Sequence, residues 1–365
     1  MIHKNNGKPA GRFAQDPMEI ITGGFPRDRL ERLAESVPID RPGVSAAQKQ
    51  LLLSRVLEHF YVEFTYARRG VTVSSQLVDE LLEGAYDLHT HGGSDPYPRL
   101  MLEDEIAIRY TRLKLKAVVL KTMYTPSASR VQLAQRIADR WSEENGMTPT
   151  KIYGSIVLGY AVGGLNSAAV RTCLGFPRFK YVFMPTFDSY WHNKIVFDDQ
   201  SGNGIKFLSD DGAVLPEMKE VLKIIADNDL ILATGHYPSA DSMSLIDEAL
   251  RLGVKRIQIV HPDEFNSRWT IKQMREWARP EIKFELGGVG VLRCLAPEGE
   301  GWYVRMIKEL GADHIVYTSD LGQVVNPPCD QGTRDVIKRL LGMGVTPEEM
   351  SVILKESPRE FLGEI

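Results

Sequence analysis

This 365-residue sequence has few cysteines, no long apolar run and no excess of positive charge. The three cysteines, Cys173, Cys294 and Cys329, are scattered with no Cys-x-x-Cys pair, which argues against a disulfide framework or a thiolate zinc site. No apolar run approaches the roughly 20 residues that span a bilayer. The first residues also lack the apolar core of a signal peptide. We therefore expect a cytoplasmic protein with no membrane partner.

The charge balance excludes another class of partner. The formal net charge is -4, and no basic cluster with interleaved aromatic residues is present, so we expect no nucleic-acid binding. Hydrophobic residues make up 43% and charged residues 25%, as in ordinary soluble globular proteins. The length suffices for one large domain or two ordinary ones.

Residues 1–82 predict an N-terminal helical extension. Within it, residues 45–66 place apolar residues four apart, and residues 74–84 give a second amphipathic pattern that closes at a glycine. The apolar faces of these helices need a partner, either the main domain or another subunit. We expect a homo-oligomer.

From Tyr86 onward, short apolar runs rich in β-forming residues alternate with amphipathic helical patterns. The eight runs are AYDLHTH, KAVVLKT, KIYGSIVLG, KYVFMPT, LILATGH, RIQIVHP, KFELGG and HIVYTSD. Eight such units predict an α/β fold, a (β/α)8 TIM barrel over residues 83–365, with a doubly wound sheet as the competing topology. After the fourth run, KIVFDDQSGNGIKFL predicts a β-hairpin insertion with a Gly-rich turn.

Histidine is rare, with eight in the chain, yet five histidines fall at the ends of predicted strands or just after them. Catalytic groups of such barrels lie at the carboxyl ends of the strands, where these side chains would meet. The five are His89, His91, His192, His236 and His261.

The spacing of the first two histidines has a physical reason. Alternate residues of a strand point to the same face, so His89 and His91 can both face the barrel axis while Thr90 points outward. Together with His236 and Asp320 they can enclose one divalent ion, and nitrogen ligands with a carboxylate suit a catalytic zinc. Each residue alone has a simpler explanation, such as a chance histidine pair or a helix-capping aspartate. Their common position at one end of the barrel favours the metal site.

Two further charged residues end predicted strands. Lys121 could be an exposed lysine, a clamp for a substrate carboxylate, or a carbamylated lysine that bridges two metals. Glu285 could orient a ligand, add a ligand, form a buried ion pair or contact the substrate. Loops supply three more candidates for substrate binding, Arg99, Tyr124 and His192, and Arg99 could hold an anionic substrate or simply be exposed.

The order of these residues resembles the amidohydrolase superfamily of metal-dependent (β/α)8 hydrolases. Phrases such as VVLKTMYTPSASR and RIQIVHPD are similar to a branch of predicted metal-dependent hydrolases. The resemblance implies that His89, His91, His236 and Asp320 bind metal. It also implies that His261 binds a second metal or polarises the substrate.

The fourth predicted strand departs from the superfamily pattern. KYVFMPTF lacks the lysine or glutamate that often bridges two metals there. The site would then hold one metal, or Lys121 would bridge two. The expected ion is zinc, with manganese and iron as alternatives.

The resemblance implies hydrolysis of a C–N or C–O bond in a small amide, cyclic amide, lactone or ester. Asp320 would move the proton, and His261 or Lys121 would stabilise the oxyanion. One alternative is a metal-dependent phosphoesterase that also opens with DLHTH, although Gly322 stands where that pattern has a histidine. A decarboxylase or deaminase on the same scaffold, and a non-catalytic binding protein, are the others.

Overall fold

The structure, a computed structural model, describes residues 73–364 except residues 97, 197, 266 and 297. The helix predicted over residues 45–66 lies outside the described residues, as does most of the predicted extension. In the part of the chain that the structure describes, no helix is long and apolar enough to cross a membrane.

Eight parallel strands form one sheet in chain order, which confirms the predicted barrel and all eight predicted strands. Two backbone hydrogen bonds join the end of the last strand to the first: Asp320 N donates to His89 O (2.8 Å) and His91 N donates to Leu321 O (2.7 Å). The strands are β1 (Tyr86–His91), β2 (Ala117–Lys121), β3 (Lys151–Val157), β4 (Phe179–Phe183), β5 (Ile231–Ala233), β6 (Ile257–Ile259), β7 (Ile282–Gly287) and β8 (Ile315–Thr318).

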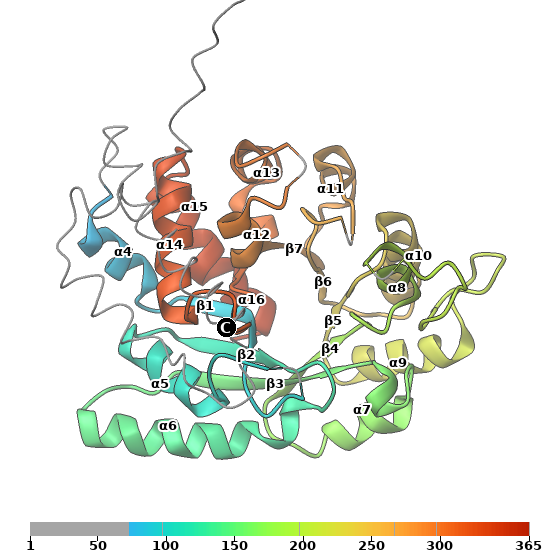
Figure 1. The fold of residues 1–365 in the computed structure, drawn as a ribbon, viewed down its shortest axis with the longest axis horizontal. Coiled ribbons are helices and arrows are strands. Elements are labelled where there is room, and N and C mark those ends of the chain that lie inside the picture. The colour runs from blue at the N-terminus through green and yellow to red at the C-terminus, as the bar shows by residue number, and fades with distance from the viewer. Residues whose placement is uncertain (1–72, 97, 197, 266, 297, 365) are drawn as a thin grey trace, which may run out of the picture.

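Helices surround this sheet (Figure 1). The α-helices are α4 (Ser75–Leu82), α5 (Glu103–Arg112), α6 (Val131–Asn145), α7 (Ser167–Cys173), α8 (Tyr190–Val196), α9 (Pro216–Asp227), α10 (Ser239–Arg251), α11 (Ile271–Trp277), α12 (Gly288–Arg293), α13 (Gly301–Leu310), α14 (Cys329–Gly342), α15 (Pro347–Ser351) and α16 (Ser357–Leu362). Short helical turns are η1 (Ser127–Ser129), η2 (Tyr160–Val162), η3 (Ala312–His314) and η4 (Val352–Glu356).

The helices form where the apolar residues recur three and four apart. In α6, Val131, Ala134 and Ala138 are buried on one face, and the helix ends at Gly146, whose φ of 63° suits glycine. Helix α4, the one predicted helix of the extension that is described, buries Val78 and Leu82. It packs against α14, so the barrel itself covers this apolar face.

The core has two parts. One lies between the sheet and the helices, and the other fills the inside of the barrel with residues such as Leu88, Val119 and Phe183. Phe361 and Leu362 of α16 belong to the inner cluster, and Figure 1 shows α16 beside β1. The last helix therefore closes the amino-terminal end of the barrel.

The β-hairpin predicted after the fourth strand is wrong. Residues Lys194–Val196 form the last turn of α8, and the Ser189 hydroxyl oxygen caps this helix by accepting a hydrogen bond from His192 N (3.0 Å). The Gly-rich stretch is a turn in which the Asp199 carboxylate accepts from Ser201 N (2.9 Å). An isolated bridge between Leu208 and Val214 is antiparallel. The insertion exists, but local side-chain hydrogen bonds favour a helix and turns over a hairpin.

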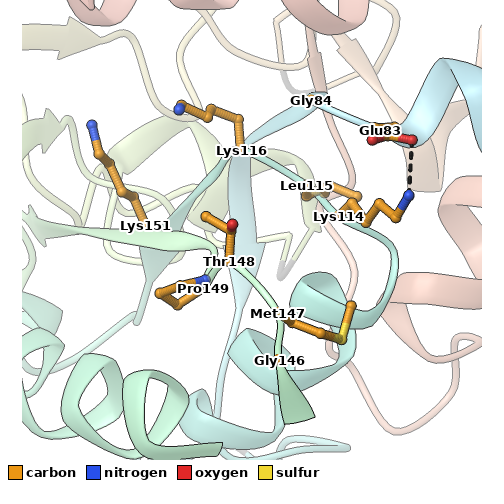
Figure 2. A pocket seen from close by; sticks show the side chains of 10 residues that line it. All are labelled: Glu83, Gly84, Lys114, Leu115, Lys116, Gly146, Met147, Thr148, Pro149 and Lys151. Carbon is orange, nitrogen blue, oxygen red and sulfur yellow. Dashed lines mark hydrogen bonds and ion pairs between the residues drawn. The ribbon is translucent and has the colours of Figure 1, made fainter. Parts of the chain in front are cut away.

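A cavity of about 490 Å³ opens at the amino-terminal ends of the strands, next to Gly84, Lys116 and Lys151. Figure 2 shows its lining, in which Lys114 pairs with Glu83 at 3.0 Å. No histidine and only one carboxylate line this cavity among the described residues. This cavity is larger than the one at the carboxyl ends of the strands, which is described below. It is still not the expected catalytic site, because barrel enzymes place their catalytic residues at the carboxyl ends.

Candidate metal centre

A second cavity, of about 300 Å³, lies at the carboxyl ends of the strands. Most of the residues predicted for the site meet there. Those that line it are His91, Arg99, Lys121, His192, His236, His261 and Asp320. Tyr124 is not among the described residues that line it, and neither is Glu285.

Three side chains converge at the end of β1. His89 Nε2 lies 3.3 Å from His91 Nε2, and Asp320 Oδ1 lies 3.2 Å from the first nitrogen and 3.0 Å from the second. Ligand atoms about 2.0–2.1 Å from a tetrahedral zinc lie about 3.3–3.4 Å from one another. The three atoms therefore fit three corners of a tetrahedral metal site.

A β-bulge aims these histidines. Leu88 belongs to the cluster inside the barrel, whereas Asp87 points outward and accepts a hydrogen bond from the Tyr110 hydroxyl of α5 (2.5 Å). Strict alternation would turn His89 outward with Asp87, but the pairing of β1 with β2 shifts between Asp87 and Thr90. This bulge re-aims His89 so that it faces the axis together with His91. The expected common face is observed, though the bulge as well as alternation produces it.

Glu285 holds two histidines at once. Its Oε2 lies 3.1 Å from His89 Nδ1, and its Oε1 lies 3.0 Å from His261 Nδ1. Gln258 Nε2 also donates to Oε2 (2.8 Å). The Glu285 side chain is fully buried behind the imidazoles, and its contact with a substrate stays a prediction. Carboxylates in this position fix the orientation and tautomer of metal-binding histidines.

His261 stands beside the three converging side chains. Its Nε2 lies 4.0 Å from Asp320 Oδ2, and its Nδ1 lies 3.6 Å from Glu264 Oε1. Glu264 does not stand out in the sequence, although it follows His261 by three residues in HPDEF. It could add a ligand or accept a proton at this side of the cavity.

His236 is near the centre but faces a different neighbour. Its ring centroid lies 5.2 Å from that of His261, and its Nδ1 lies 3.0 Å from His192 Nδ1. Among the described residues, the tightest groups of potential ligands include His89, His91, His261, Glu264, Glu285 and Asp320 but not His236. His236 therefore stays a predicted ligand.

The backbone is strained where the strands deliver these side chains. His261 and Asp320 both have φ of 50°, a region that residues other than glycine seldom occupy and that concentrates at functional sites. Gly235, before His236, has φ of 68°, and a Cβ there would lie 2.5 Å from Pro185 O. The turn before His236 therefore requires glycine.

Burial and neighbouring charges set the protonation of the cluster. Burial, with the Lys121 charge, lowers the pKa of His89 to about 3. Burial, with the Arg99 charge, holds the pKa of His91 well below its usual range. Both are then neutral imidazoles at pH 7, the form that binds metals. Burial alone would lower the pKa of His261, but the carboxylates of Glu264, Glu285 and Asp320 raise it to about 10. This imidazolium balances the surrounding negative charge.

Comparison with protein families identifies the chain. Residues 84–285, more than half of the sequence, match the model of a family of unknown function, DUF6282. The chain belongs to this family. No curated protein matches the sequence significantly.

Solved structures share the fold. An amidohydrolase from Pseudomonas aeruginosa is 12% identical, with 79% of this chain and 97% of that chain covered and a TM-score of 0.53. An amidohydrolase from Burkholderia multivorans with bound zinc is 14% identical, with 76% and 99% covered and a TM-score of 0.51. The fold expected from the resemblance to the amidohydrolase superfamily is thereby confirmed.

Proposed function

We propose that this protein is a metal-dependent hydrolase of small molecules that cleaves a C–N or C–O bond at a carbonyl group. The observation that carries the proposal is the mutual approach of His89 Nε2, His91 Nε2 and Asp320 Oδ1 to within 3.0–3.3 Å. The likeness in fold to amidohydrolases, one of them with bound zinc, supports the proposal.

His89, His91 and Asp320 would hold the metal, with His261 or His236 completing the set. Zinc fits this mixture of imidazole nitrogens and a carboxylate, and manganese or iron remain alternatives. When bound in such a site, a divalent ion polarises a carbonyl oxygen and lowers the pKa of its water toward about 7.

The residues around the metal would divide the remaining work. Asp320 would accept a proton from the attacking water and return it to the leaving group. Glu285 would keep Nδ1 of His89 protonated and so leave Nε2 free to bind metal. If His236 completes the metal set, His261 would stay an imidazolium and donate a hydrogen bond to the developing oxyanion.

The backbone at Gly322 disfavours the phosphoesterase alternative. That alternative needs a histidine at this position, but Gly322 has φ of 125° and a Cβ there would lie only 1.8 Å from His91 O. No side chain fits without moving β1.

Turnover on a panel of small lactones, cyclic amides and esters tests the proposal. We expect hydrolysis that stops on chelation, returns with added zinc, and incorporates oxygen from labelled water. Product formation without incorporation of solvent oxygen would indicate a decarboxylase or isomerase instead. Small-molecule binding without turnover of any substrate would support a non-catalytic binding protein.

A further inference from the structure

Lys121 carries a buried charge into the cavity. The residue is only 1% exposed, and its ammonium nitrogen lies 4.8 Å from the ring centroid of Phe183. Among the described residues, no carboxylate oxygen lies within the 4.0 Å of Lys121 Nζ that defines an ion pair. A buried ammonium is costly unless an anion or hydrogen-bond acceptor meets it.

Two arginines line the same cavity, and neither is left to move freely. Arg99 pairs with Asp95 at 2.9 Å and forms a backbone bridge with Gln323. Arg293 donates to Asn326 Oδ1 (2.6 Å). The two are linked through the loop after β8, because Asn326 Nδ2 donates to Gln323 Oε1 (2.7 Å).

The carboxylates of the cavity are already engaged with histidines. Asp320 contacts His89 and His91, and Glu264 lies beside His261. The wall formed by Lys121, Arg99 and Arg293 is therefore cationic and held in place before a ligand arrives, which favours recognition of an anion.

We propose that the substrate carries an anionic group, a carboxylate or phosphate, which binds the cationic wall of Lys121, Arg99 and Arg293. This inference rests on the proposed function only in placing that group beside the reacting carbonyl. A cavity of about 300 Å³ at the small end of ligand sites limits the substrate to a small molecule.

Calorimetric titration of the full-length, metal-loaded protein with malonate, inorganic phosphate and the neutral malonamide tests the proposal at pH 7. We expect malonate or phosphate to bind at least about 10-fold more tightly than malonamide, and the tighter anion identifies the group. Lys121→Met and Arg293→Gln should each weaken that anion by about 10- to 100-fold, the usual loss for a charged hydrogen bond. Arg171→Gln is the matched control, because this arginine lies on α7 with a side chain 61% exposed.

Metal content and a thermal unfolding curve are recorded for each variant. Should Lys121→Met not fold, the anion affinity of Arg293→Gln decides the test. Equal affinity for malonate and malonamide would overturn the proposal. So would unchanged anion affinity in the folded variants with metal intact, because the anion would then bind the metal alone. Failure of the proposed function shows separately, as absence of metal or of carbonyl hydrolysis, and the anion preference can be measured without turnover.

Discussion

The two ends of the barrel arrange their charged side chains differently. At the amino-terminal end, the Glu364 carboxylate accepts hydrogen bonds from the hydroxyls of Tyr86 (3.0 Å) and Tyr153 (2.5 Å) and pairs with Lys151 (2.8 Å). At the carboxyl end, imidazoles and carboxylates crowd together within 3.0–3.3 Å. The first arrangement satisfies its charge with the protein's own donors, as a structural contact does. The second gathers potential ligand atoms around a point suited to a cation. The carboxyl end of this barrel is therefore assigned to function and the amino-terminal end to stability.

The largest effect is expected for Asp320→Asn. The amide keeps an oxygen near His91 but cannot accept a proton, so turnover should fall by about 10²- to 10⁴-fold while metal content stays near that of the wild type. Steady-state kinetics and elemental analysis of the same preparation measure both. A variant with nearly full turnover would remove Asp320 from proton transfer.

Two glycines, one at each end of the barrel, allow the cost of adding a side chain to be compared between the two ends. Gly322, at the carboxyl end, and Gly84, at the amino-terminal end, have φ of 125° and 81°. A Cβ at Gly322 would lie 1.8 Å from His91 O, whereas one at Gly84 meets nothing within 4 Å. Gly322→Ala should lower the free energy of unfolding by about 3–5 kcal/mol, and Gly84→Ala by about 1 kcal/mol. Chemical denaturation measures both, and equal losses would contradict the close packing of this loop on β1.

Two glutamates, Glu285 at the carboxyl end and Glu364 at the amino-terminal end, give a matched pair of substitutions. Glu285→Gln should weaken metal affinity by about 10- to 100-fold, because its contacts with His89 and His261 orient both rings. Glu364→Gln should leave metal affinity unchanged and lower the free energy of unfolding by about 1 kcal/mol. Competition with a metal-binding dye gives the affinities. Loss of metal from Glu364→Gln would mean that the two ends are coupled.

The smallest expected effect is the pH dependence of the stability that Glu364 contributes at the amino-terminal end. Although burial alone would raise the pKa of Glu364, its hydrogen bonds with Lys151, Tyr153 and Tyr86 lower it below the usual value. A folded-state pKa below the unfolded one stabilises the protein above the unfolded pKa, about 4.3. The advantage of the wild type over Glu364→Gln should therefore be present at pH 7 and fade as the pH falls through the folded-state pKa. Denaturation of both proteins at several pH values checks this, and a constant difference would argue against it.

The sequence predicted the barrel and the converging residues because both follow from short-range rules. Apolar runs and amphipathic periods mark the strands and helices, and the carboxyl ends of parallel strands must meet. His89, His91, His261 and Asp320 were found in this way. Glu285 was also singled out, but only the structure shows that it lies behind the histidines.

The other features of the site depend on contacts between residues far apart in the chain, which no local sequence pattern contains. Glu264 lies in the turn after β6 and Arg293 is the last residue of α12, and only the folded structure shows that both line the cavity. The bulge in β1 arises from a shift in its pairing with β2. The residues expected to form a hairpin were β-like in type, yet a serine cap made their first part a helix.

Metal stoichiometry tests the central claim most directly. Purified full-length protein, supplied with zinc and then freed of excess metal, is compared with the His89→Ala/His91→Ala variant by elemental analysis, and circular dichroism confirms that both are folded. We predict at least one equivalent of tightly bound divalent metal in the wild type and almost none in the variant. A wild-type protein without stoichiometric metal, or a folded variant that keeps all of it, would contradict the account.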